Sequence, residues 1–120
     1  MNELMAQITV GVLPGYNVNN TAAINIENFC FNLVYDEGGV PYYIPWLVIP
    51  ARTVYKKEWG CPDSGEIVYV LQGTYNKKYN SDITVDEWKE YVMEYARYLK
   101  KQYKQSTIRV SFMQSETVII

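Results

Sequence analysis

The spacing of apolar residues changes several times along the chain, and each change marks a predicted element. Near the start, Ile8, Val10 and Val12 alternate with small or polar residues, which predicts a strand. Residues 66–75 alternate in the same way and predict a second well-defined strand. A third alternation over 108–112 predicts a strand near the end of the sequence.

The segment 42–57 is apolar and extended, but Pro45 and Pro50 interrupt it. Proline cannot donate a backbone hydrogen bond, so it is confined to edge strands and bends of a sheet. We therefore expect this segment to form an edge strand or a bent strand.

Residues 22–36 fit two patterns. Helical spacing places the apolar residues on one face and four polar residues opposite them, while residues 29–35 also alternate as in a strand. We favour a helix because of the polar stripe and because the glycine pair at 38–39 suits a helix end. The extended alternative stays open on sequence grounds.

A second helix is predicted after residue 84 by a capping box. The Thr84 hydroxyl can accept from the Glu87 amide, and the Glu87 carboxylate can accept from the Thr84 amide. Asp86 adds negative charge at the positive end of the helix dipole. The apolar stripe that this helix buries consists of Val85, Trp88, Val92, Tyr95 and Leu99.

These elements give the order β-α-β-β-α-β over residues 1–120, which we take as one α+β domain. Right-handed crossovers in both βαβ units produce a ferredoxin-like sandwich: a four-stranded antiparallel sheet with two helices on one face. That topology puts the second strand at an edge, in agreement with its two prolines. Many unrelated proteins share this architecture, so it says little about function.

The composition argues against several kinds of partner and site. The net charge of -2 gives no general attraction to nucleic acid, so a nucleic-acid partner is not expected. There is no histidine, and the two cysteines, Cys30 and Cys61, cannot form a zinc site between them. We therefore predict no metal and no cofactor. No secretory signal or apolar span is present, so we expect no membrane partner and a reducing, cytoplasmic location with free thiols.

Twelve tyrosines and three tryptophans are available for the sheet. Alternation puts large residues on both faces of the second and third strands, and only one face is covered by helices. A monomer seldom exposes a broad apolar patch, so we expect a homodimer, a protein partner or a small molecule there; the apolar tail 117–120 is the alternative cover. The ligand- or partner-binding candidates are Tyr43, Trp46, Trp59, Tyr69 and Tyr16.

The loop around Cys61 is the best candidate for catalysis. A cysteine near cations such as Arg52 can have a lowered pKa and act as a nucleophile, although no histidine is available as its base. Glu58 and Glu66 offer a carboxylate pair for acid–base work if the strand pairing brings them together. The non-catalytic alternatives are an unreactive loop cysteine and ordinary cross-strand charge pairs.

The sequence supports three hypotheses about function. We favour a small interaction module that self-associates through its sheet and binds a protein or small ligand, such as a phage-encoded inhibitor of a host system. The second is a small enzyme that uses Cys61 with Arg52, Glu58 and Glu66. The third is a regulatory domain that senses a small ligand. No catalytic motif is present, so the sequence favours a protein that is not an enzyme.

Overall fold

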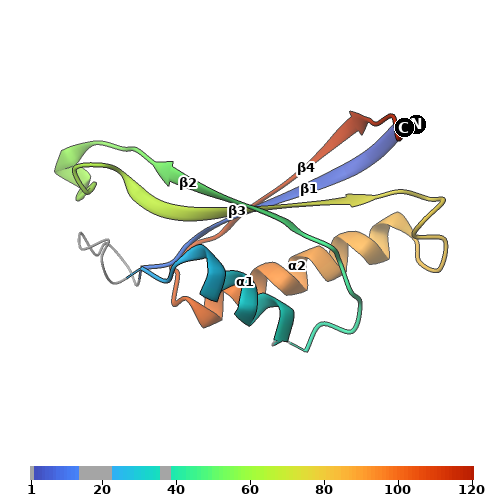
Figure 1. The fold of residues 1–120 in the computed structure, drawn as a ribbon, viewed down its shortest axis with the longest axis horizontal. Helices are drawn as coiled ribbons and strands as arrows, with labels where there is room; N and C mark the ends of the chain where they lie inside the picture. Colours follow the sequence, from blue (N-terminus) through green and yellow to red (C-terminus); the bar gives the residue numbers. More distant parts are fainter. Residues whose placement is uncertain (1, 14–22, 36–38) are drawn as a thin grey trace.

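The computed structural model describes residues 2–13, 23–35 and 39–120. Four strands and two α-helices alternate in the order βαββαβ, with a short 3-10 helix between the second and third strands (Figure 1). The elements are β1 (Asn2–Gly11), α1 (Ile26–Tyr35), β2 (Leu47–Thr53), η2 (Lys57–Trp59), β3 (Glu66–Tyr75), α2 (Val85–Gln102) and β4 (Arg109–Glu116).

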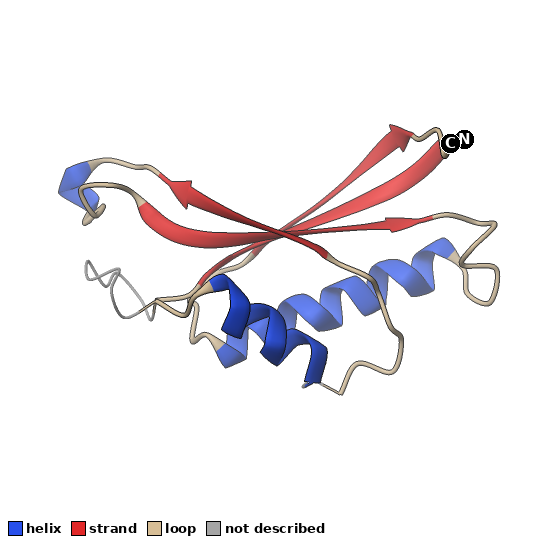
Figure 2. Ribbon diagram, in the orientation of Figure 1, coloured by secondary structure: helices blue, strands red, loops and turns tan. Residues whose placement is uncertain are grey.

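The strands form one antiparallel sheet in the order β2-β3-β1-β4, and both helices lie on the same side of it (Figure 2). The predicted ferredoxin-like topology is confirmed, and β2 lies at an edge as expected. Pro50 sits within β2 opposite Tyr69. An edge position tolerates it, since one side of that strand needs no partner.

Within the segment 22–36, residues Ile26–Tyr35 form the helix α1, which settles the choice that the sequence left open. Asn25 begins α1: its side-chain oxygen accepts from the Asn28 amide at 2.9 Å. The helix ends at Tyr35, and Gly39 has a left-handed φ of 70°. The capping box of α2 is also present, with Thr84 and Glu87 exchanging hydrogen bonds of 3.0 and 3.1 Å.

The expected strand over 42–57 is shorter than predicted. Only Leu47–Thr53 pairs with β3, and residues 57–59 turn into the helix η2. The 3-10 helix is closed by Gly60, whose φ of 92° is left-handed and suits glycine. The remainder of this segment runs as irregular connections on either side of β2.

The core lies between the sheet and the helices and is rich in aromatic rings. Phe29 of α1 packs against Tyr69 of β3, with ring centroids 4.6 Å apart, and against Tyr103 at 5.3 Å. The Tyr69 hydroxyl donates to the Ile24 carbonyl at 2.6 Å, which ties the start of α1 to the sheet. Trp88 of α2 is fully buried.

Trp46, one of the predicted binding residues, and its neighbour Val48 do not lie on the open face. Val48 pairs with the core residue Leu71, and the Trp46 ring meets Tyr95 of α2, with centroids 5.5 Å apart. Both residues therefore belong to the helix-covered side. The hydrophobic pattern could not assign a face, because β2 is apolar on both sides.

The open face is more polar than expected. Val68 and Val70 lie on it, but Gln7 and Gln72 sit side by side at its centre, joined by a hydrogen bond of 3.1 Å. The tail residues Val118 to Ile120 are exposed, with Val118 at 76%, so the tail does not cover this face. No helix within the described residues is long and apolar enough to cross a membrane.

Candidate active site

Several connections meet at the end of the sheet opposite the chain termini (Figure 1). The connection from β2 to β3, the connection from α2 to β4 and the end of β1 all reach this end. Loops held by a rigid sheet are where binding and catalytic side chains concentrate. The Cys61 loop predicted from the sequence belongs to this group.

Glu66 stands at the centre of this end. It is the first residue of β3 and pairs with Thr53, so its side chain projects on the open face together with Val68. Burial raises the pKa of Glu66 above its ordinary value of 4.5, and a hydrogen bond from the Tyr55 side chain offsets part of that rise. The result is a partly desolvated carboxylate whose position is fixed by a neighbouring phenol.

Gln105, from the connection between α2 and β4, reaches the same place. Its amide nitrogen donates to the Leu13 carbonyl at 2.7 Å and to the Tyr103 carbonyl at 2.9 Å. A Cβ added to Gly11 would lie 2.6 Å from the Gln105 Oε1 atom and 3.1 Å from the Glu66 Oε1 atom. Because Gly11 has no side chain, both oxygens can approach the backbone of the sheet closely at this position.

The Cys61 thiol makes hydrogen bonds with backbone groups of its own loop. Its Sγ atom accepts from the Tyr55 amide at 3.5 Å and donates to the Pro62 carbonyl at 3.3 Å. The thiol therefore braces the backbone of the residue whose hydroxyl reaches Glu66. The loop then closes through a turn in which the Gly65 amide donates to the Pro62 carbonyl at 2.9 Å.

The four predicted catalytic residues do not form one cluster. Arg52 pairs with Ile67, so it lies on the opposite face of the sheet from Glu66, where its Nη1 atom donates to the Ser64 hydroxyl at 3.5 Å. Glu58 lies exposed in η2. Glu66 and Cys61 both interact with Tyr55, Glu66 with its side chain and Cys61 with its backbone amide, and the sequence analysis did not select Tyr55.

The predicted binding residues are also dispersed. Tyr69 and Trp46 pack in the helix-covered core, while Tyr43 is 64% exposed beside the start of β2. Trp59 is 63% exposed in the same loop as Cys61, with the Lys56 ammonium 5.3 Å from its ring centroid. Tyr16 lies outside the described residues.

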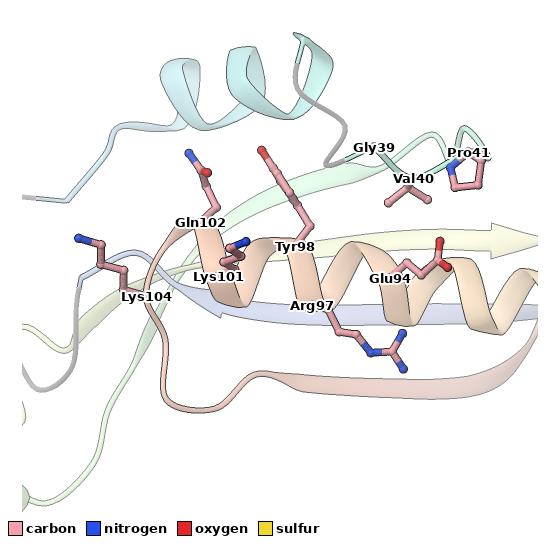
Figure 3. A pocket seen from close by; sticks show the side chains of 9 residues that line it. All are labelled: Gly39, Val40, Pro41, Glu94, Arg97, Tyr98, Lys101, Gln102 and Lys104. Carbon is pink, nitrogen blue, oxygen red and sulfur yellow. The ribbon is translucent and has the colours of Figure 1, made fainter.

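A large hollow in the described structure lies elsewhere. An open groove of about 840 Å³ runs between α2 and the segment that leads into β2 (Figure 3). Its lining residues are Gly39, Val40, Pro41, Glu94, Arg97, Tyr98, Lys101, Gln102 and Lys104. Three of these are cationic and one is anionic, and Figure 3 shows the Arg97 side chain pointing away from the groove.

No group of three metal-ligating side chains gathers anywhere in the described parts of the chain. The groups that the structure places around Tyr55 and Gly11 are the Glu66 carboxylate, the Tyr55 phenol, the Gln105 amide oxygen and the Cys61 thiol. Such a set can bind and orient a cationic group.

Comparison with known proteins identifies the family. The model of the SAM lyase family matches residues 1–120, the whole sequence. A search of curated proteins finds no match.

Two solved structures share the fold. One is a phage SAM lyase in complex with S-methyl-5'-thioadenosine, at 14% identity and a TM-score of 0.55, covering 92% of this chain and 80% of that chain. The other is a phage SAM lyase in the apo state, at 17% identity and a TM-score of 0.57, covering 92% and 79%. At these identities the likeness shows the fold alone.

The family match overturns the expectation of a non-enzymatic interaction module and supports the alternative of a small enzyme. That expectation was wrong because it treated the lack of histidine and of known motifs as evidence against catalysis. Since the family model spans the sequence from its first residue to its last, the chain belongs to the SAM lyase family.

Proposed function

We propose that this protein cleaves S-adenosylmethionine into S-methyl-5'-thioadenosine and homoserine lactone. The observation that carries the proposal is the family match over residues 1–120. The similar phage SAM lyase that was solved with S-methyl-5'-thioadenosine supports the identity of one product.

The reaction needs little acid–base chemistry. A carboxylate oxygen of the substrate attacks its own Cγ atom, the bond from Cγ to sulfur breaks, and the bonding electron pair neutralises the sulfonium. No water, external base or cofactor is consumed. The enzyme's main task is to fold the substrate into the geometry of attack, which is a matter of positioning.

The loop end of the sheet suits this substrate. S-adenosylmethionine carries a positive sulfonium and a positive ammonium, and Glu66 supplies a negative charge in a partly buried setting. Attack of a carboxylate on a sulfonium removes two opposite charges, so a site with less water than bulk solvent favours it. The groove of Figure 3 is a poorer candidate, because cationic side chains outnumber anionic ones there.

Copies of the chain are also proposed to associate through the open face. Leu47 at 61% and Met113 at 38% exposure lie on that face at its two edge strands. Their burial would remove apolar surface from water. The cytoplasmic location remains a prediction of the sequence.

The activity itself is tested by mixing the purified protein with S-adenosylmethionine and following both products by liquid chromatography and mass spectrometry. We expect S-methyl-5'-thioadenosine and homoserine lactone in equal amounts. Glu66→Gln should lower kcat/KM on the order of 100-fold, because a substrate held in the wrong geometry loses that much rate. Glu58→Gln, an exposed neighbour in the same loop, is the matched control and should keep the wild-type rate.

No product from the wild-type protein would refute the proposed function. A Glu66→Gln variant as fast as the Glu58→Gln control would instead leave the function standing and remove Glu66 from the site.

A second prediction concerns stability against pH. Burial raises the pKa of Glu66, so the folded protein holds this proton more tightly than the unfolded chain does. Well below pH 4.5 the group is protonated in both states. As pH rises through the raised pKa, ionisation costs stability, and the cost persists at neutral pH. Glu66→Gln should therefore unfold at higher urea than the wild type at pH 7, with the difference closing near pH 4; a variant less stable at pH 7 contradicts this.

A third prediction distinguishes two roles of Cys61, that of a hydrogen-bond partner of the Tyr55 backbone and that of a nucleophile. If the thiol only braces Tyr55, Cys61→Ala should lower kcat by less than about tenfold, since such a hydrogen bond contributes about 1 kcal/mol. Cys30→Ala is the matched control for loss of a free thiol and should keep the wild-type kcat. Complete loss of activity in Cys61→Ala alone would restore the nucleophile hypothesis.

Self-association is measured by light scattering over a range of protein concentrations. We expect a mass above that of one chain, and we expect Leu47→Glu to reduce it by placing a charge on the open face. A mass of one chain at every concentration contradicts the proposal.

A further inference from the structure

The orientation of the Gln105 amide is fixed by its partners. Its nitrogen donates to two carbonyl oxygens, those of Leu13 and Tyr103, at 2.7 and 2.9 Å. Carbonyl oxygens only accept hydrogen bonds, so the amide nitrogen, and not the amide oxygen, must face them. The amide oxygen is therefore held on the other side, over Gly11.

Two acceptor oxygens converge at that place. The Gln105 Oε1 atom and the Glu66 Oε1 atom both lie within contact distance of the position that a Gly11 Cβ would occupy. Glu66 begins β3 and Gln105 lies in the connection between α2 and β4, 39 positions apart in the sequence, and one of the two oxygens belongs to a carboxylate. A carboxylate and an amide oxygen side by side form a site for a group that both carries positive charge and donates hydrogen bonds.

The substrate offers one such group. Its ammonium has three N–H donors, whereas its sulfonium has none to give to an amide oxygen. The reaction also removes the charge of the sulfonium but keeps that of the ammonium. An anion bound tightly to the sulfonium would stabilise the substrate more than the transition state, while an anion on the ammonium stabilises both alike.

We propose that Glu66 and Gln105 together form the subsite for the α-ammonium group of S-adenosylmethionine, with Gly11 as its floor. The proposal rests on the proposed function and assigns a part of the substrate to named atoms. Gly11 keeps both oxygens low on the sheet, and Gln105 supplies a neutral acceptor beside the charged one. The ammonium end of the substrate is thereby anchored without holding the sulfonium.

The test compares two ligands that are not cleaved, by isothermal titration. S-adenosylhomocysteine and S-methyl-5'-thioadenosine are both neutral thioethers, but only the first carries the ammonium and the carboxylate. Gln105→Leu and Gly11→Ala should each weaken S-adenosylhomocysteine roughly 10-fold or more, as expected for a lost hydrogen bond to a charged group. Both should leave the affinity for S-methyl-5'-thioadenosine unchanged.

Gln102→Leu is the matched control, because it makes the same glutamine-to-leucine change in the groove of Figure 3. It should alter the affinity for neither of the two ligands. The wild-type protein gives an independent check that needs no variant: the deaminated form of S-adenosylhomocysteine should bind at least about 10-fold more weakly than the parent compound. Thermal unfolding of each variant confirms that it is folded.

Equal affinity of the wild-type protein for the parent and the deaminated ligand overturns the subsite. An equal loss of affinity for both thioethers in the two folded variants also overturns the subsite. Gln105 and Gly11 would then only maintain the local structure. In either case, formation of S-methyl-5'-thioadenosine by the wild-type protein would show that the proposed function itself survives.

Discussion

The placement of one carboxylate on the open face of the sheet is the constraint on which the account depends. Glu66 lies where β2 and β3 begin to pair, and the register with Thr53 turns its side chain away from the helices. Burial disfavours its charged form, and Tyr55 partly compensates. The fold thus maintains a partly desolvated negative charge beside two converging connections and the end of β1. Such a charge is costly for stability and useful for a cationic ligand.

The proposed reaction explains how so small a chain can be an enzyme without histidine. The substrate contains its own nucleophile and its own leaving group, so the protein need not activate either one. What remains is binding, orientation and limited exclusion of water, which a sheet face and a few loop side chains can supply. Fold alone would not indicate this, because the βαββαβ architecture carries many unrelated activities.

The sequence predicted the architecture well and the site only in part. Alternating strands and the capping box at Thr84 are local signals that predicted the order of the elements, and the right-handed crossover rule then gave the topology. The prolines around β2 agree with its edge position. Cys61 was selected as a loop cysteine near cations, and Glu66 was selected as a possible carboxylate partner of Glu58. Arg52 was misplaced, since proximity in sequence does not say which face of a strand a side chain occupies.

The remaining site residues carry no local signal. Gln105 approaches Gly11 only because the crossover through α2 returns the chain to the same end of the sheet. Gly11 looks like an ordinary small residue in an alternating strand, and its role is visible only when its neighbours are placed. Tyr55 is one of twelve tyrosines, and composition cannot distinguish it from those in the core.

A crystal structure of the protein with S-adenosylhomocysteine tests the central claim most directly. The account predicts the ligand at the loop end of the sheet, with its amino nitrogen within hydrogen-bond distance of the Glu66 carboxylate. A ligand bound instead in the groove beside Tyr98 and Lys101, with Glu66 left untouched, would contradict it.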